Sequence, residues 1–335
     1  MSDTVLITGA SGFIGSHLLN RCLQDGYRVR ALVRANNACI PSLQEAGVEV
    51  VVGDIRDAAA VDEAVKGCRL VFHTAALTSD WGPAKLFADI NIGGTRNVCA
   101  AALSHGVRRL VHVSSFECFA HYALDRVDES SPFVPRNASY ADTKIGSTEI
   151  VQEFTAKGLQ TSIVYPVWVY GPLDRTLIPL LADSIRRRQL VYWAPRARMS
   201  LIYIDNLVDL LMLAATHPTA AGEGFMACDG EEMTFGGLCE RLATGIGAPP
   251  PSLTLPAPVV YFLADLLEFV YRLARSSVRP VLTRQVVTLF SSRAVIDSSK
   301  ARRLFGWTPR VCQEEGLRRT IGWLTGIDPS EWKKK

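Results

Sequence analysis

A glycine-rich segment near the start of the chain, Thr8-Gly9-Ala10-Ser11-Gly12-Phe13-Ile14-Gly15, limits the fold more than any other feature. It follows a short apolar run that is typical of a buried parallel strand, and it opens a stretch with apolar residues at helical spacing. In this context Gly9 permits a tight turn, Gly12 lets the backbone approach a pyrophosphate, and Gly15 permits close packing of helix on strand. The segment therefore predicts a phosphate-binding turn at the N-terminus of a helix.

The alternation of strand and helix patterns continues well beyond this turn. Further strands are expected at 29–33, 48–52, 70–72, 110–113 and 161–164, and helices at 91–104 and 140–156. Such alternation predicts an α/β fold, a doubly wound parallel sheet with helices on both faces. Ligands of these sheets bind beyond the carboxyl ends of the strands. After residue 171 the pattern loosens, which predicts a smaller, mostly helical substrate-binding domain.

The composition excludes several classes of function. Hydrophobic residues make up 48% and charged residues 21% of the 335 residues, as in globular proteins, and a net charge of +3 gives no reason to expect a nucleic-acid partner. The eight cysteines form no CxxC pair and none lies near a histidine at metal-ligand spacing, so no metal site is expected. Free thiols and the absence of room for a signal peptide before the glycine turn predict a cytoplasmic location.

The residue at the end of the second strand indicates which dinucleotide is bound. An acidic residue about twenty positions after the glycines would bind the ribose hydroxyls of NAD. This chain has Arg34 instead, whose guanidinium could pair with the 2′-phosphate of NADP. NADP(H) is therefore preferred, although NAD(H) with a solvated Arg34 remains an alternative. Asp54 and Ile55 are placed to contact the adenine, and Asp54 could equally cap the following helix.

Tyr140 and Lys144 form a second motif, because residues four apart share one face of a helix. A nearby ammonium, together with a positive nicotinamide, would lower the pKa of the Tyr140 phenol, which would then act as general acid or base. Ser115, just after another expected strand, could hydrogen-bond the substrate oxygen, with Ser114 as a competing choice. His73 is interpreted as a structural histidine. Asn91 either supports the site through a water or holds backbone at a helix start.

These motifs together resemble the extended short-chain dehydrogenases/reductases, most closely the branch of the 3β-hydroxysteroid dehydrogenases and dihydroflavonol reductases. Further matches follow the same order along the chain: Gly53-Asp54, His73-Thr74-Ala75-Ala76, Asn91 to Thr95, Val113-Ser114-Ser115, Pro166, Val169 to Pro172 and Tyr203 to Asn206. Tyr165, where many relatives have arginine, departs from the family pattern.

The resemblance implies a Rossmann domain over 1–170, onto which 200–216 would fold back, a substrate-binding domain over 171–335, and a homodimer. It implies Ser115, Tyr140 and Lys144 as the catalytic triad and a bulky, mainly apolar alcohol or ketone as substrate. The cofactor would be bound by Gly9, Ser11, Gly12, Phe13, Ile14, Gly15, Arg34, Asp54, Ile55, Thr74, Ala75, Ala76, Tyr140, Lys144, Pro166 and Val169.

An apolar stripe at helical spacing lies in the C-terminal half. Its members are Val259, Phe262, Leu263, Leu266, Leu267, Val270 and Leu273. Core packing is the simpler interpretation. The alternatives are a lid over an apolar substrate and a helix that makes peripheral contact with a membrane.

Three functions fit the sequence. The leading one is an NAD(P)-dependent oxidoreductase that interconverts a secondary alcohol and a ketone on a sterol-, flavonoid- or polyketide-like molecule. The second is a nucleotide-sugar epimerase or dehydratase that retains NAD, against which Arg34 and the apolar C-terminal region count. The third is a non-catalytic NADP sensor, against which the intact Tyr140 and Lys144 pair counts.

Overall fold

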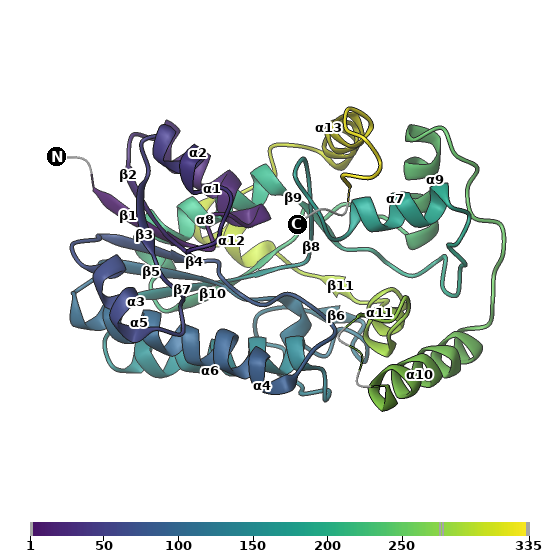
Figure 1. The fold of residues 1–335 in the computed structure, drawn as a ribbon, viewed down its shortest axis with the longest axis horizontal. Coiled ribbons are helices and arrows are strands. Elements are labelled where there is room, and N and C mark those ends of the chain that lie inside the picture. The colour runs from purple at the N-terminus through teal and green to yellow at the C-terminus, as the bar shows by residue number, and fades with distance from the viewer. Residues whose placement is uncertain (1–2, 275, 277, 333–335) are drawn as a thin grey trace.

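The computed structural model describes residues 3–274, 276 and 278–332. A sheet of seven parallel strands forms its centre, in the order β10-β7-β5-β4-β1-β2-β3 (Figure 1). Its strands are β1 (Thr4–Thr8), β2 (Arg28–Val33), β3 (Glu49–Val52), β4 (Leu70–His73), β5 (Arg109–Val113), β7 (Thr161–Pro166) and β10 (Glu223–Ala227). The chain reverses its direction of travel across the sheet between β1 and β4, as in a doubly wound fold. The predicted fold class is confirmed.

Helices cover both faces of the sheet, which explains why its strands are apolar on both sides. One face carries α3 (Ala58–Val65), α5 (Gly94–Ser104) and α6 (Ser139–Ala156), which pack against one another. The other carries α1 (Phe13–Gln24) and α8 (Ile204–Thr216), and α8 also contacts β5 and β7. The short helices α2 (Ile40–Glu45) and α4 (Ala84–Phe87) follow β2 and β4, and a π-helical turn (Ala88–Gly93) joins α4 to α5.

The C-terminal part of the chain adds helices and short strands beyond one end of the sheet (Figure 1). Two small parallel pairs connect it to the rest: β8 (Trp168–Tyr170) with β9 (Leu201–Tyr203), and β6 (Arg126–Val127) with β11 (Val295–Ile296). Its helices are α7 (Ile178–Arg186), α9 (Phe235–Gly245), α10 (Ala257–Leu273), α11 (Arg284–Leu289), α12 (Ser299–Phe305) and α13 (Gln313–Thr325). Short 3-10 turns lie at Phe116–Cys118 and Pro218–Ala220.

Strand β10 is the element of the main sheet that the sequence pattern did not indicate. It pairs with β7 from Glu223↔Ser162 to Ala227↔Pro166, so it follows α8 as the last strand of the sheet. Its sequence, Glu-Gly-Phe-Met-Ala, has a glycine and no β-branched residue, and therefore carries little strand propensity. Pairing with a neighbouring strand places it, rather than local preference.

Core packing is the wrong interpretation for most of the apolar stripe in α10. Phe262 is 65% exposed, Leu273 is 74% exposed, and Val259, Leu263, Leu266 and Val270 are exposed as well. The helix packs through a different sector, with Val260 and Ala264 buried against Trp193, Leu255, Tyr261 and Leu282. Helix α10 thus has two apolar sectors, one inward and one facing solvent. No helix within the described residues is long and apolar enough to cross a membrane.

Candidate active site

The glycine-rich turn forms a tight cradle between β1 and α1. Gly9 has φ +77°, and a Cβ on it would lie 2.8 Å from the backbone nitrogen of Ala75. A Cβ on Gly15 would lie 2.1 Å from the Gly9 carbonyl oxygen. Both positions therefore require glycine. Helix α1 begins at Phe13, directly after Gly12, and presents unpaired N–H groups at the carboxyl edge of the sheet. This geometry fits a dinucleotide pyrophosphate.

Arg34 lies exposed at the end of β2, beside this turn. The loop after it is joined to the glycine turn, because Asn37 Nδ2 donates to Ser11 Oγ at 2.8 Å. Asp54 is occupied by Arg56, with both carboxylate oxygens 2.9 Å from the guanidinium, and this pairing lowers the pKa of Asp54. The alternative that Asp54 caps the next helix is wrong: Asp57 is the N-cap of α3, where its carboxylate accepts from two backbone N–H groups.

Three of the predicted cofactor residues follow β4 and lie against the glycine turn. Thr74 Oγ1 donates to the Thr8 carbonyl oxygen at 2.7 Å, and the Ala75 N–H donates to Thr8 Oγ1 at 3.4 Å, with Ala76 next in the chain. His73, buried beneath them, contacts Thr8 Oγ1 at 2.8 Å and Thr95 Oγ1 at 2.9 Å. Burial lowers the pKa of His73 to about 3, so the ring is neutral and ties β4 to its neighbours, which supports the structural interpretation.

The remaining predicted contacts lie around the same edge. Ile55 is buried under α5, where a Cβ on Gly94 would lie 2.6 Å from its Cδ1. Pro166 ends β7, and Val169 is half-buried in β8. Phe13 and Ile14 open α1 and are partly buried against the core.

Ser115 and Tyr140 lie close together, since the Ser115 side chain is near enough to the phenol to lower the pKa of Tyr140, against the larger effect of burial. Ser115 follows β5, and Tyr140 stands in the first turn of α6. The competing Ser114 turns away and bonds Thr148 Oγ1 at 2.7 Å. Ser115 is therefore the serine that accompanies the tyrosine.

Lys144 is buried one turn further along α6 and donates to the Val113 carbonyl oxygen at 2.6 Å. Burial lowers the pKa of Lys144 to about 8. The expected lowering of the Tyr140 pKa does not occur in this structure: burial raises that pKa, and the nearby Glu117 carboxylate raises it further. The expectation also included a positive nicotinamide, so it stays a prediction for the cofactor complex.

Asn91 has a larger part in the site than sequence reasoning gave it. Its side chain is buried in the π-helical turn, accepts from the Leu77 N–H at 2.7 Å, and donates to Thr143 Oγ1 at 3.0 Å. It thus links the loop after β4 to the residue next to Lys144 in α6. A π-helical turn often marks a functional position, but it has no recognisable sequence signal.

Sequence reasoning also missed a buried carboxylate, Glu117, two residues after Ser115. Arg136, in the loop before α6, donates from one guanidinium nitrogen to the Glu117 carbonyl oxygen at 2.8 Å and to its Oε2 at 3.4 Å. Gln285 of α11 donates to the same Oε2 at 2.8 Å. The pattern Ser-Ser-Phe-Glu contains this glutamate, but only the fold shows that it is buried beside Tyr140.

The loop after β4 also contacts the C-terminal part of the chain. Asp80, in the loop after β4, forms an ion pair with Arg279 and accepts from Thr283 Oγ1 at 2.6 Å. Trp81 Nε1 donates to the Ser276 carbonyl oxygen at 3.1 Å, and its ring packs edge-on against Tyr271 of α10. The segment between α10 and α11 is thereby held against the loop that follows β4.

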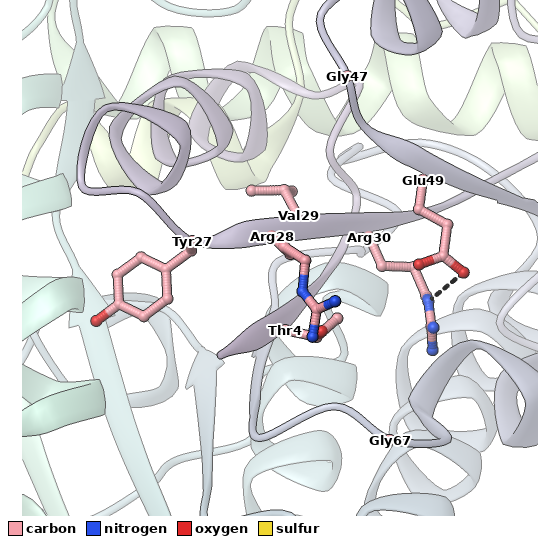
Figure 2. Close-up of a pocket in the computed structure, with 8 residues that line it drawn as sticks. All are labelled: Thr4, Tyr27, Arg28, Val29, Arg30, Gly47, Glu49 and Gly67. Atoms are coloured by element: carbon pink, nitrogen blue, oxygen red, sulfur yellow. Dashed lines mark ion pairs between the residues drawn. The ribbon is translucent and has the colours of Figure 1, made fainter. Parts of the chain in front are cut away.

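The opposite edge of the sheet holds a cavity of about 460 Å³ that contains none of the predicted residues. Figure 2 shows its lining at the amino ends of the strands, with Thr4 of β1, Arg28 and Arg30 of β2, and Glu49 of β3. Arg30 already has partners within the protein: its Nε lies 2.9 Å from Glu49 Oε1, and one guanidinium nitrogen donates to the Lys66 carbonyl oxygen at 2.7 Å. The residues predicted to bind the cofactor and to catalyse the reaction lie instead toward the carboxyl edge of the sheet.

Residues 5–227 match the model of the NAD dependent epimerase/dehydratase family, over most of the elements just described. The chain belongs to this family. The resemblance found in the sequence is confirmed, and the chain is an NAD(P)-dependent oxidoreductase of the short-chain dehydrogenase/reductase type. Among its relatives is a 2-alkyl-3-oxoalkanoate reductase of Stenotrophomonas maltophilia, 32% identical, with 94% of this chain and 97% of the relative covered.

Another relative supports the predicted branch. A 3beta-hydroxysteroid-dehydrogenase/decarboxylase of Arabidopsis thaliana is 29% identical, with 94% of this chain and 78% of that protein covered. Among solved structures, a UDP-glucose 4-epimerase of Thermotoga maritima superposes with a TM-score of 0.77 at 20% identity, with 96% of this chain and 99% of that one covered. At that identity the likeness concerns the fold alone.

Proposed function

We propose that this enzyme interconverts a secondary alcohol and a ketone on a bulky, mainly apolar molecule, with Tyr140 moving the proton. The observation that carries the proposal is the placement of Tyr140, in the first turn of α6, close to Ser115, which follows β5 at the same edge of the sheet as the glycine cradle. The names of the relatives, a reductase of 2-alkyl-3-oxoalkanoates and a 3β-hydroxysteroid dehydrogenase, are consistent with substrates of this class. We assign substrate recognition to the helices after residue 171.

A nicotinamide cofactor held by the glycine cradle would supply or accept the hydride. Ser115 Oγ donates to the substrate oxygen and orients it. Tyr140 donates its phenolic proton to that oxygen when a ketone is reduced, and accepts it when an alcohol is oxidised. Lys144, buried one turn further along α6, supplies positive charge for the phenolate that forms. Asn91 holds the backbone on which these groups depend.

The test is Tyr140→Phe, compared with Tyr27→Phe as a matched control. Tyr27 lies at the opposite edge of the sheet, in the cavity of Figure 2. We expect Tyr140→Phe to lower kcat by at least about a hundredfold, as loss of a general acid does, while cofactor affinity stays unchanged. Tyr27→Phe should leave both unchanged. Full turnover in Tyr140→Phe would refute the assignment.

We further propose that the enzyme prefers NADP(H). Support comes from Arg34, exposed beside the glycine turn, and from the absence of a free carboxylate at Asp54, which Arg56 occupies. Fluorescence titration should give tighter binding of NADPH than of NADH, and Arg34→Asp should reverse the order. Arg28→Asp, a change of the same kind at the far edge, should alter neither affinity.

We also propose that the exposed face of α10 contacts a lipid surface and that the enzyme is a homodimer. Along α10, Val259, Phe262, Leu266, Phe269 and Leu273 face solvent, and Arg272 in its last turn, which pairs with Glu268, adds a cation for phosphate headgroups. The helix adjoins the segment that closes the site, where an apolar substrate would enter. Co-sedimentation with liposomes tests the first proposal, and sedimentation velocity tests the second.

A further inference from the structure

Glu117 is the charged side chain that the proposed reaction leaves without a role. It is buried directly behind Ser115, and its carboxylate is held from two sides. Arg136 approaches from the loop before α6, and Gln285 approaches from α11 in the C-terminal part of the chain. Both bond Oε2, and the Glu117 side chain is only 9% exposed. A buried carboxylate is costly to maintain even when it is paired, which suggests that it serves a purpose other than stability.

The charged and titratable groups around Glu117 come from four elements. Arg136 is its counter-ion, and Asp80, from the loop after β4, is a second acid that already pairs with Arg279. Tyr140 belongs to α6, which packs against the 3-10 turn that holds Glu117. His121 contacts Arg136 at 3.1 Å, but burial lowers its pKa to about 3, so it adds no charge. Cys118 also acts on Tyr140, but burial raises the pKa of its thiol, so it stays neutral, and Glu117 is therefore the group through which a negative charge acts on Tyr140.

This charge has a definite sign of effect on Tyr140. A carboxylate beside a phenol disfavours the phenolate, and burial disfavours it as well, so both raise the pKa of Tyr140. Burial also raises the pKa of Glu117 to about 7, so its charge is itself present or absent in the neutral range. When Glu117 is protonated, it no longer raises the pKa of Tyr140. When Glu117 is ionised, it raises that pKa again.

We propose that Glu117 is a positioning residue of the active site: its carboxylate, clamped between Arg136 and Gln285, keeps Tyr140 as the neutral phenol that protonates a ketone and sets the pH at which alcohol oxidation begins. The proposal rests on the proposed function of Tyr140. Because Gln285 belongs to α11, the clamp also depends on the C-terminal segment being packed on the sheet. It is carried by the two clamping contacts and by the burial of the carboxylate beside the Ser115–Tyr140 pair.

The test is the ionisation of Tyr140 in Glu117→Gln, followed by NMR of protein labelled with ¹³C at tyrosine Cζ. The Tyr140 signal is assigned by its loss in Tyr140→Phe, and the titration is run without cofactor and with saturating NADP⁺. Glutamine has the same shape and can accept both hydrogen bonds, and Arg136 stays anchored by the Glu117 carbonyl oxygen. We expect the midpoint of the NADP⁺ complex to fall by at least about one pH unit, as expected for the loss of a charge near a titrating group.

Three further variants separate this role from a structural one. Glu117→Asp keeps the charge and should keep the midpoint close to that of the wild type. Glu153→Gln makes the same change at an exposed glutamate on α6 and should have no effect. Gln285→Leu removes one of the two side-chain hydrogen bonds to the carboxylate without changing any charge. It should shift the Tyr140 midpoint less than Glu117→Gln does.

An unchanged Tyr140 midpoint in folded Glu117→Gln would overturn the inference, whether or not the variant is active. The readout needs no substrate, so failure of the proposed function and failure of this inference are distinguishable. A shifted Tyr140 midpoint in an enzyme that reduces no ketone would support the role of Glu117 and refute the proposed function. If Glu117→Gln does not fold, Glu117→Asp must reproduce the wild-type midpoint, and a shift of one unit or more in that variant refutes the proposal.

Discussion

Replacing Gly15 with alanine tests the cofactor cradle at its tightest point. A Cβ there would lie 2.1 Å from the Gly9 carbonyl oxygen and 2.7 Å from the Gly9 carbonyl carbon, so the glycine turn must move by roughly 1 Å. Overpacking of this kind costs about 1–3 kcal/mol, and the higher helix propensity of alanine returns about 1 kcal/mol. We expect a net loss of about 1 kcal/mol of stability and a fall in Tm of about 3 °C.

The cofactor should be affected more strongly than stability. The same shift displaces the N–H groups of the turn and of the first turn of α1 from the pyrophosphate. We expect at least a tenfold loss of affinity for NADPH, or about 1.4 kcal/mol, measured by fluorescence titration.

Gly322→Ala is the matched control, because Gly322 lies exposed in α13 and a Cβ there would meet nothing within 4 Å. Alanine at that position should raise stability by up to about 1 kcal/mol and leave the affinity for NADPH unchanged. If Gly15→Ala bound NADPH as tightly as the wild type and melted at the same temperature, the assignment of the turn as the cofactor cradle would be refuted.

Other changes give separate expectations. Asn91→Ala removes the bonds to Leu77 and Thr143 and should cost about 1–3 kcal/mol in urea unfolding, with a larger loss in kcat than in cofactor affinity. Burial raises the pKa of Glu117 from 4.5 to about 7, so the contribution of this group to stability is present below pH 4.5 and is lost as the pH rises through 7. Glu117→Gln has no such group. Its Tm, measured by calorimetry, should therefore depend less on pH between 5 and 8 than that of the wild type. Phe262→Glu with Phe269→Glu should leave Tm nearly unchanged and abolish sedimentation with liposomes, and retained sedimentation would exclude α10 as the contact.

The sheet was predictable because each of its first strands is an apolar run followed by a glycine or polar turn. Such runs can be recognised from the sequence without knowledge of tertiary contacts. The glycine turn was predictable for the same reason. Strand β10 was not, because Gly224 and Met226 give it little propensity of its own and the edge of β7 determines its place.

The packing of the C-terminal helices was harder to foresee. In α10 two apolar sectors are present, and hydrophobic spacing alone cannot tell which of them faces the protein. Val260 and Ala264, smaller than the exposed Phe262 and Leu266, turn out to be the buried ones. The smaller side chains let the helix approach Trp193, a contact between residues about 70 positions apart that leaves no local signal.

The candidate site divides in the same way. Motif residues such as Tyr140 and Gly15 follow from spacing on one helix or turn. Glu117, Arg136 and Gln285 come from three separate segments, and their contact exists only once α11 packs against the 3-10 turn that follows β5. The burial that raises the pKa of Glu117 is likewise a property of the whole fold.

The central claim is a net transfer of hydride from the cofactor to a ketone. The most direct measurement follows the product of a 2-alkyl-3-oxoalkanoate incubated with NADPH that carries deuterium in both positions at C4 of the nicotinamide. The account predicts one deuterium at the new carbinol carbon for each NADPH oxidised, detected by mass spectrometry, and transfer slowed by at least about a hundredfold in Tyr140→Phe. Conversion of a UDP-sugar without consumption of added cofactor, with no reduction of any apolar ketone, would contradict it and favour an epimerase that retains NAD.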